Sequence, residues 1–453
     1  MKQELYRSLC SVLAMALMTG CVHLRPDESH SAVEQRSGPR MLQPLTRDNE
    51  ANLVEFTQSL TNDVTLGLLT AIALRGNPEL RVFEAEIAAA RGEVITVSTW
   101  DHPELSVARR ITHETEGSRI QVLLGQIGLQ QKILFPGKRA LQHAVAQKNV
   151  EIQQVALAGF RSQLGIQVRR AYFTLLAAQQ VLPLREQRLT LAKTFVEAAK
   201  KRVDAGIAPE FEATKAEVEV VNAQTALRLA EAGVLTARTE LNVLMGRKPE
   251  EPLLVSGALG PDVQLRDTQY LLGQTLARNP SLKVQAAEVE RTGLSLRLTQ
   301  KSRYPDFTVG PGFETEPGLQ VFSFGLSVPL TLWDKKKGPI ATATAEQERA
   351  MGELEKLRQE ILGRVTTAQQ NLTAVKDTLT NYTPEFLGRL RAALDAASQS
   401  YSEGRTPLLL FLETQRTYFE TQASYFESLE RLYQTQAELE SAVGVPLDEI
   451  PKP

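Results

Sequence analysis

The sequence predicts a mostly α-helical chain that also supplies four strands to a membrane β-barrel. Three observations support this fold class: a long run of helix formers with a seven-residue repeat, a duplication of about 200 residues, and two pairs of segments in which apolar residues alternate with small or polar ones. Each half of the chain is therefore expected to hold helices, a strand pair and a long helical hairpin that packs as a coiled coil.

The long run extends from Ala140 to Val203. At a rise of about 1.5 Å per residue, one helix of this length would span about 100 Å. A strict seven-residue spacing keeps one face against a partner helix only when the two helices supercoil. A long helix in a soluble bundle, or in a coiled-coil dimer, is the alternative interpretation. The residues that repeat at every seventh position are Val168, Leu175, Leu182, Leu189, Val196 and Val203.

Composition argues against several classes of function. The formal net charge is −2 and basic residues are interspersed with acidic ones, so no nucleic-acid partner is expected. The sequence contains no Gly-rich phosphate loop, and its histidines lack the spacing of a metal site or a catalytic triad. We therefore expect no cofactor, no metal site and no enzymatic activity. The histidines are His23, His30, His102, His113 and His143.

The N-terminus has the pattern of an export signal over residues 1–20, with basic residues before a short apolar core. Leu17-Met18-Thr19-Gly20-Cys21 resembles a bacterial lipobox, although Met18 stands where that pattern prefers leucine. The resemblance implies that Cys21 is lipidated and becomes the mature N-terminus, and Val22 after it favours sorting to the outer membrane. Residues 21–62 are polar and are expected to form the lipidated tether.

The duplication divides the rest of the chain into a first repeat at 63–250, a second repeat at 251–445 and a C-terminal tail at 446–453. Matching motifs recur in the same order, about 200 residues apart, and the small changes in their separation fall in turns. The matched pairs are Asn77-Pro78 with Asn279-Pro280, His102-Pro103 with Tyr304-Pro305, Glu114-Thr115-Glu116 with Glu314-Thr315-Glu316, Gly206-x-x-Pro209 with Gly404-x-x-Pro407, and Gly246 with Gly444.

Strand pairs are predicted at 104–133 and 306–330. Alternation is clearest in Phe322, Phe324, Leu326, Val328 and Leu330, which suits a strand that is apolar on one face and wet on the other. Unpaired sheet edges cannot face lipid, and the smallest membrane barrels need about eight strands, so several chains must combine their strands. Two hairpins that cap a soluble helical bundle are the alternative.

The long helical hairpins are predicted at 140–246 and 342–444. In the first hairpin the returning helix is much shorter than the descending one, and a helix that starts at Glu79 has the length to continue it end to end. Pro183 and Pro384, near the middle of the two descending helices, are expected to bend the helix axis, and Pro384 is also expected to interrupt the second helix. Gly246 and Gly444 are expected to end the returning helices.

The duplicated order of strands and long helices, preceded by the lipobox, resembles the TolC family of outer-membrane efflux channels over Thr65 to Val445. Leu326 to Ile340, at the end of the second strand pair, is most similar to the CzcC-like heavy-metal efflux branch, and its counterpart in the first repeat is Leu134-Phe135-Pro136-Gly137-Lys138-Arg139. Tyr401-Ser402-Glu403-Gly404 with Leu412-Glu413-Thr414-Gln415-Arg416 resembles the family's second hairpin tip. The resemblance implies a homotrimer with a twelve-stranded barrel in the outer membrane and an α-helical tunnel across the periplasm.

The resemblance also implies a function and partners. The chain would be the passive outer-membrane conduit of a tripartite efflux system, for heavy-metal cations or drugs, and would meet a periplasmic adaptor and an inner-membrane pump of the RND type. The alternatives are a periplasmic adaptor lipoprotein of an efflux or secretion system, a type I secretion channel, and a purely structural coiled-coil envelope lipoprotein.

The candidate site residues lie at the far ends of the long helices. Gly206, Pro209, Gly404 and Pro407 occupy the two hairpin turns and are expected to dock the partner. By resemblance, Glu413 matches an acidic residue of the family's constriction ring. Leu410 stands where the family has a second acidic residue, so Leu410 and Glu413 are the predicted gate. The alternatives are ordinary hairpin turns, a solvated Glu413 and a Leu410 packed in the helical seam.

Overall fold

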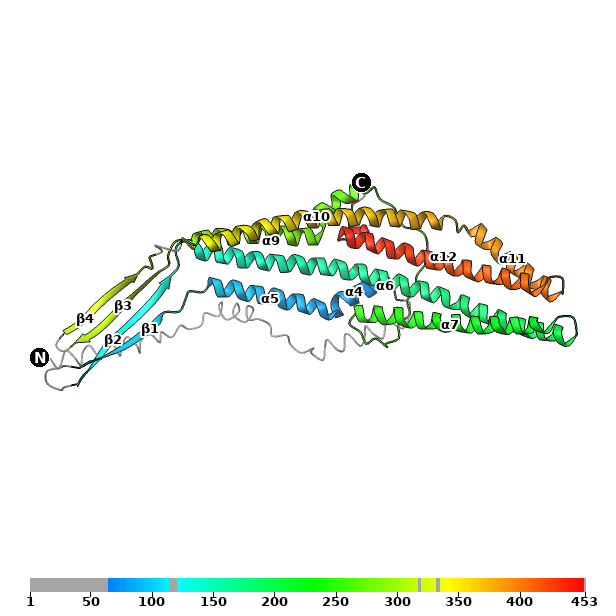
Figure 1. The fold of residues 1–453 in the computed structure, drawn as a ribbon, viewed down its shortest axis with the longest axis horizontal. Helices are drawn as coiled ribbons and strands as arrows, with labels where there is room; N and C mark the ends of the chain where they lie inside the picture. Colours follow the sequence, from blue (N-terminus) through cyan, green and yellow to red (C-terminus); the bar gives the residue numbers. More distant parts are fainter. Residues whose placement is uncertain (1–63, 114–119, 317–318, 331–334, 452–453) are drawn as a thin grey trace, which may run out of the picture. The chain divides into compact units, whose positions relative to one another are not determined.

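The computed structural model describes residues 64–113, 120–316, 319–330 and 335–451. The chain divides into two units, residues 1–58 and 59–453, and all described residues belong to the second. The predicted signal at 1–20, the tether at 21–62 and the lipidation residue Cys21 lie outside the described residues. Figure 1 shows the second unit as long helices that run side by side, with four strands at one end.

The elements follow the duplicated order. In the first repeat they are α4 (Leu66–Gly76), α5 (Pro78–Ser98), β1 (Glu104–His113), β2 (Ile120–Ile133), α6 (Lys138–Asp204) and α7 (Glu210–Leu244). In the second repeat they are α8 (Thr268–Arg278), α9 (Pro280–Lys301), β3 (Phe307–Glu316), β4 (Leu319–Ser327), α10 (Lys337–Leu379), α11 (Pro384–Ser402) and α12 (Leu408–Val443), followed by a 3₁₀ turn at Leu447–Glu449.

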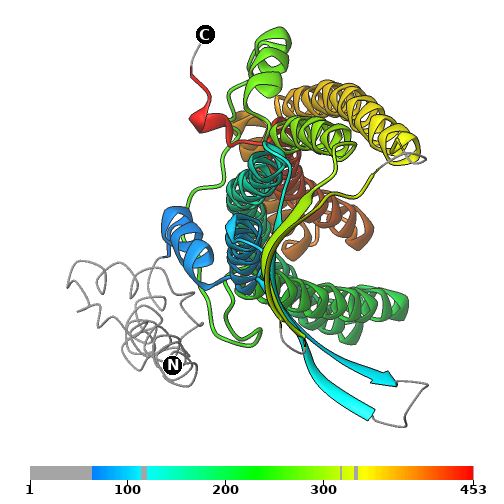
Figure 2. The same ribbon diagram turned by 90° about the vertical axis from the view of Figure 1, so that its left-hand side faces the viewer.

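The four strands form one antiparallel sheet in the order β1-β2-β3-β4, so the pairing of β2 with β3 joins the two repeats. Figure 2, which views the molecule from the strand end, shows that this sheet is curved. The register sets apolar residues opposite one another on one face, as in the pairs Val107 with Ile127 and Phe313 with Phe322. The other face carries small and polar residues such as Gly312 and Ser323, which are also paired. The predicted alternation is therefore present in the sheet, but β4 ends at Ser327, so Val328 and Leu330 lie beyond the strand in which they were predicted.

α6 is the central element of the helical part. Its 67 residues pack against α5, α7, α9 and α12, so it contacts helices of both repeats. Three apolar clusters lie along the bundle, one in each repeat and a third near the turns that end α6 and α11. Among the residues of the predicted seven-residue repeat, Val168 and Leu175 are fully buried. No helix among the described residues has both the length and the apolar character needed to cross a lipid bilayer.

The returning helices are continued end to end, as the sequence predicted. The side chain of Asn279 caps α9 by accepting hydrogen bonds from the N–H groups of Ser281 (3.0 Å) and Leu282 (3.3 Å). Its Nδ2 donates to the carbonyl oxygens of Ala442 and Val443 at the end of α12, both at 3.1 Å. One asparagine thus satisfies backbone groups at both helix ends, which otherwise lack intrahelical partners.

Asn77 makes the same connection in the first repeat. Its Oδ1 accepts from the N–H of Glu79 at the start of α5, and its Nδ2 donates to the carbonyl oxygen of Leu244 at the end of α7, both at 2.9 Å. The junction is close: a Cβ on Gly76 would lie 2.4 Å from the carbonyl oxygen of Met245. Gly246 and Gly444, the predicted helix ends, have φ of 72° and 92°. α7 with α5, and α12 with α9, therefore form two composite helices.

The two prolines of the descending helices behave differently. Pro183 lies inside α6, which continues through it as the one long helix that the sequence predicted; the bend expected there stays a prediction. The second descending helix does stop, and α11 starts at Pro384 after the cap residue Thr383, whose hydroxyl accepts from the N–H of Phe386 at 3.1 Å. The residues that precede each proline in the sequence explain the difference. Helix formers precede Pro183, whereas threonine and asparagine, which favour caps and turns, precede Pro384.

A buried ion pair ties α6 to the end of the chain. Arg169 of α6 contacts the fully buried Glu440 of α12 and the exposed Asp448 of the C-terminal segment, each at 2.8 Å. Burial raises the pKa of Glu440 and outweighs the opposing attraction of Arg169. Loss of either partner would leave a buried polar group without compensation, which is costly.

Replacing Asn279 with alanine should destabilise the protein by about 1–3 kcal/mol, because the substitution removes a helix cap and two bridging hydrogen bonds. The expected result is a lower thermal midpoint of the detergent-purified protein, measured by circular dichroism. Asn222→Ala, at an exposed position inside α7, is the matched control and should leave the midpoint unchanged or slightly higher. Equal midpoints for the two variants would contradict a stabilising role for the junction.

Candidate functional site at the helical tips

The two hairpin turns lie at the ends of the helices opposite to the strands (Figure 1). Gly206 and Gly404 adopt φ of 70° and 75°, a conformation that favours glycine. Each turn closes in the same way: the N–H of Gly206 donates to Val203 and that of Gly404 to Tyr401, both at 2.9 Å. A Cβ at either glycine would meet open space, so only backbone strain opposes a larger residue there.

The prolines of these turns immediately precede the returning helices. Pro209 and Pro407 are cap residues with extended backbones, at φ −71° and ψ 150° and at φ −69° and ψ 150°. A proline ring fixes φ near these values, so the two turns have matching geometry.

The predicted gate residues share one face of α12. Leu410 is 53% exposed and its neighbour Leu409 is 63% exposed, and Glu413 is also exposed one turn further along the helix. The opposite face is buried, with Leu408 at 3% and Phe411 at 0% exposure. Leu410 therefore does not pack into the helical seam of its own chain, and it offers an apolar side chain beside the carboxylate of Glu413.

An aromatic cluster beneath the tips was not predicted. Phe195 of α6 stacks on Phe411 of α12 with ring centroids 3.6 Å apart, and the ring of Tyr401 at the end of α11 lies 5.2 Å from Phe195. Tyr401 and Phe411 are fully buried. The sequence shows aromatic residues on helix faces that are otherwise rich in alanine. This pattern does not indicate which aromatic rings contact one another.

Polar groups adjoin this cluster. The guanidinium of Arg202 lies 5.0 Å from the centre of the Tyr401 ring and donates to the Tyr401 carbonyl oxygen at 3.3 Å. Burial raises the pKa of the Tyr401 phenol, with Arg202 acting against the rise and Glu212 adding to it. The phenolic oxygen of Tyr401 and one carboxylate oxygen of Glu212 are buried without a hydrogen-bond partner among the described residues. Arg202 and Tyr401 therefore link the tips of the two hairpins.

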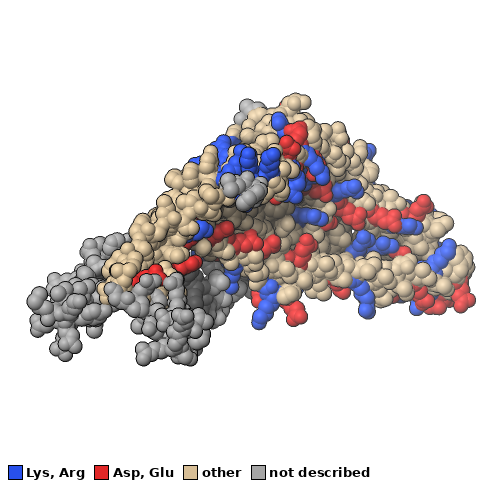
Figure 3. Space-filling model, turned by 60° about the vertical axis from the view of Figure 1, so that its left-hand side comes forward, with Lys and Arg blue, Asp and Glu red and all other residues tan. Residues whose placement is uncertain are grey.

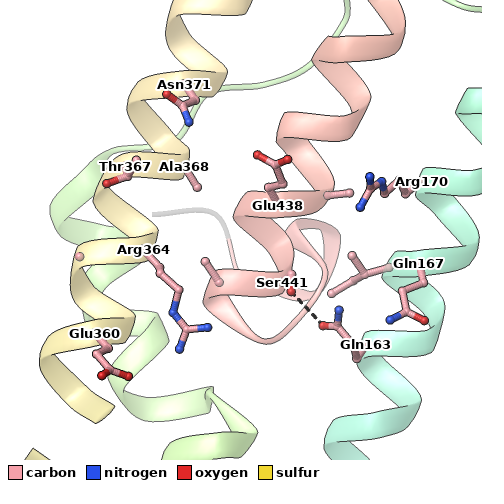
Figure 4. A pocket seen from close by; sticks show the side chains of 14 residues that line it. Gln163, Gln167, Arg170, Glu360, Arg364, Thr367, Ala368, Asn371, Glu438 and Ser441 are labelled. Atoms are coloured by element: carbon pink, nitrogen blue, oxygen red, sulfur yellow. Dashed lines mark hydrogen bonds between the residues drawn. The ribbon is translucent and has the colours of Figure 1, made fainter. Parts of the chain in front are cut away.

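A cavity with a mixed lining lies further along the bundle, between α6, α10 and α12. It has a volume of about 580 Å³, and Figure 4 shows the side chains that line it from the three helices. Ser441 donates to Gln163 across it at 3.1 Å. Charged groups of both signs, including Arg170 and Glu438, point toward this space (Figure 4).

The described residues contain no group of three or more His, Cys, Asp or Glu side chains arranged to hold a metal ion. Of the histidines in the described part, His102 precedes β1, His113 ends it and His143 lies on α6. The candidate site therefore consists of long helices that end in two matched turns.

Comparison with known proteins identifies the family. A family model described as outer membrane efflux protein matches residues 69–247 and 271–445, which is more than half of the chain and includes both repeats. This chain belongs to that family. The outer membrane efflux proteins are conduits, so the predicted resemblance to outer-membrane efflux channels is confirmed, and with it the location in the outer membrane.

Two relatives are metal-resistance proteins by name. The chain is 25% identical over 391 residues to the cobalt-zinc-cadmium resistance protein CzcC of Cupriavidus metallidurans, with coverage of 86% of this chain and 92% of that protein. It is 23% identical over 289 residues to the nickel-cobalt-cadmium resistance protein NccC of Alcaligenes xylosoxydans xylosoxydans, with coverage of 62% and 64%. The predicted similarity to the CzcC-like branch is therefore also found over most of the chain.

A solved structure has the same fold. The outer-membrane channel OprN superposes with a TM-score of 0.72 at 18% identity, covering 86% of this chain and 92% of that one. This agreement confirms the mostly helical fold with a few antiparallel strands that the sequence predicted for a member of the efflux family.

Replacing both Gly206 and Gly404 with leucine should abolish efflux and leave membrane assembly intact. The reason is that a bulky residue with positive φ distorts the turn, while the open space around both glycines spares the rest of the fold. The measurement is metal or drug export by cells that carry the variant, with the amount of outer-membrane protein as the reference. Gly388→Leu, at a helical glycine of α11 with open space around it, is the control. Normal export by the double variant would contradict a docking role for the turns.

Proposed function

We propose that three copies of this chain form one channel, with a twelve-stranded barrel in the outer membrane and an α-helical tunnel in the periplasm. The observation that carries the proposal is the pairing of the sheet: within the described residues β1 pairs only with β2, and β4 only with β3. Unpaired backbone groups at these two edges cannot face lipid. Three copies close the sheet and leave a lumen, because a wider barrel is not filled by its side chains.

The outer edge of the helical bundle supports the same assembly. α7 packs against α6 within the chain, yet its other side is exposed and apolar. A second copy would cover these residues, much as the partner of a coiled coil covers a seam. They include Phe211 (57% exposed), Val218 (54%), Val221 (60%) and Leu229 (69%).

We propose further that the channel is a passive outlet for heavy-metal cations and takes its energy from partners. The names of CzcC and NccC support this cargo. The tips at Gly206 and Gly404, with Pro209 and Pro407, would meet a periplasmic adaptor, and an inner-membrane pump of the RND type would drive transport. Three Glu413 carboxylates around a narrow axis would attract cations, and three Leu410 side chains beside them would restrict water when the mouth is closed. Lipidated Cys21 would add an anchor in the outer membrane.

Deletion of residues 306–330, which hold the second strand pair, should prevent barrel formation. Three chains would then supply too few strands to close a barrel, and the unpaired edges of the sheet cannot face lipid. The measurement is cross-linking of the detergent-extracted protein, followed by electrophoresis. The unaltered protein is expected to give a trimer and the deletion variant is not. Cross-linking that gives only monomers of the unaltered protein would refute the assembly.

Single-channel recording in planar bilayers tests the conduit and its gate together. Glu413→Ala should lower the preference for cations and weaken block by multivalent cations, because a ring of negative charge is lost. Leu410→Ser should raise the resting conductance, since a polar ring no longer resists wetting. Glu427→Ala is the control, because Glu427 is also exposed on α12 but lies further from the tip. Wild-type selectivity and conductance in both gate variants would locate the gate elsewhere.

A further inference from the structure

A second cavity lies where the helices meet the strands. It has a volume of about 610 Å³ and is formed between the first turn of α6 and the end of α9. Its apolar wall is made by Ala140 and Leu141. The remaining lining residues are Gly137, Arg297, Gln300, Lys301, Arg303 and Tyr304.

The charge of this cavity is strongly one-sided. Three of its lining residues are basic, and none of those in the described part of the chain is acidic. Arg297 and Arg303 are exposed and form no ion pair within the described residues. Within the described residues, the one hydrogen bond of the Lys301 ammonium is to the carbonyl oxygen of Pro136, at 3.5 Å. Figure 3 shows basic side chains gathered at this end of the helices, next to the tan surface of the strands.

A carboxylate that follows the cavity in sequence is already paired. Asp306, two residues after Tyr304, accepts a hydrogen bond from the buried Lys138 at 2.8 Å and another from the N–H of Phe135 at 2.9 Å. Burial favours the neutral carboxyl, but these hydrogen bonds outweigh it and the pKa of Asp306 is lowered. Asp306 and Lys138 therefore compensate each other, and the three cations of the cavity keep their positive potential.

The position of the cavity relates it to a membrane surface. Tyr304 lies just before β3, and its ring stacks on Phe135, which lies just after β2, with centroids 4.6 Å apart. Trp100, which precedes β1, is 62% exposed and lies 3.9 Å from the guanidinium of Arg139. Aromatic rings beside basic groups, directly below strands with an apolar face, are typical of the boundary between hydrocarbon and water.

We propose that Arg297, Lys301 and Arg303 bind the phosphate of an anionic phospholipid headgroup in the periplasmic leaflet of the outer membrane. The proposal rests on the proposed function, because it takes the strands as the membrane-crossing segments. Guanidinium groups bind phosphate oxygens in a bidentate manner, and the wall of Leu141 and Ala140 suits the start of the lipid's apolar part. The bound headgroup would fix the depth at which the channel sits in the membrane.

Lipid titration of the detergent-purified full chain tests the site. The probe is a short-chain phosphatidylglycerol, and bound lipid is measured by native mass spectrometry. Each basic side chain near an anionic lipid surface contributes about fivefold in affinity, so the variant Arg297→Gln/Lys301→Gln/Arg303→Gln should bind about 100-fold more weakly. The control Arg349→Gln/Lys356→Gln/Arg358→Gln removes the same charge from exposed positions on α10 and should bind like the unaltered protein.

Two further ligands distinguish the source of the phosphate. Phosphatidylcholine, which has no net charge, and inorganic phosphate should both bind much more weakly than phosphatidylglycerol. Equal affinity of the triple variant and the control would overturn the proposal, as would equal binding of phosphatidylcholine. Tighter binding of inorganic phosphate would assign the cavity to a free anion instead. If the triple variant does not assemble, the single variant Arg303→Gln, at an exposed position, replaces it. Its affinity for phosphatidylglycerol should fall about fivefold, and an unchanged affinity would overturn the proposal.

Bilayer recordings of the same preparations separate this proposal from the proposed function. Normal channel currents with no difference in lipid binding between variant and control would remove the lipid site and leave the channel. Absence of current in the unaltered protein would remove the channel, whatever the lipid titration shows.

Discussion

A helix of 67 residues must be covered along its whole length, and the rest of the structure depends on how α6 meets this requirement. A single returning helix of 35 residues covers only part of it. The remainder is covered by α5, which lies end to end with α7. The side chain of Asn77 joins them, because it caps the start of α5 and donates a hydrogen bond to the last residue of α7. The equivalent asparagine, Asn279, repeats the solution, so local hydrogen bonding at two residues sets the length of the bundle.

The second requirement is that the two repeats share their surfaces. β2 pairs with β3, Lys138 at the start of α6 pairs with Asp306 before β3, and Arg169 pairs with Glu440 near the end of α12. Each of these ties takes one partner from each half of the duplication. Neither repeat therefore has a complete core alone, even though each has its own apolar cluster. The duplicated sequence has produced one cooperative unit.

Sequence reasoning succeeded where the physics is local or periodic. Seven-residue spacing identified α6, alternation identified the strands, and the Asn-Pro motifs marked the helix junctions that the structure contains. It also predicted that α6 is one long helix and that the second descending helix is interrupted at Pro384. It missed the stacking of Phe195 on Phe411, because contacts between residues so far apart in the chain leave no periodic signal. The proposed roles of Leu410 and Glu413 depend on neighbouring copies, which a single chain does not contain.

The contact between α6 and α12 has a consequence for biogenesis. α6 is translated and exported long before α12, yet Arg169 finds its buried partner Glu440 only when the last helix arrives. Folding dominated by such distant pairings is slow and leaves apolar surface uncovered in the meantime. The emerging chain therefore has to be held unfolded during translocation, and a product truncated before α12 would keep an uncovered face on α6 and be a substrate for proteases.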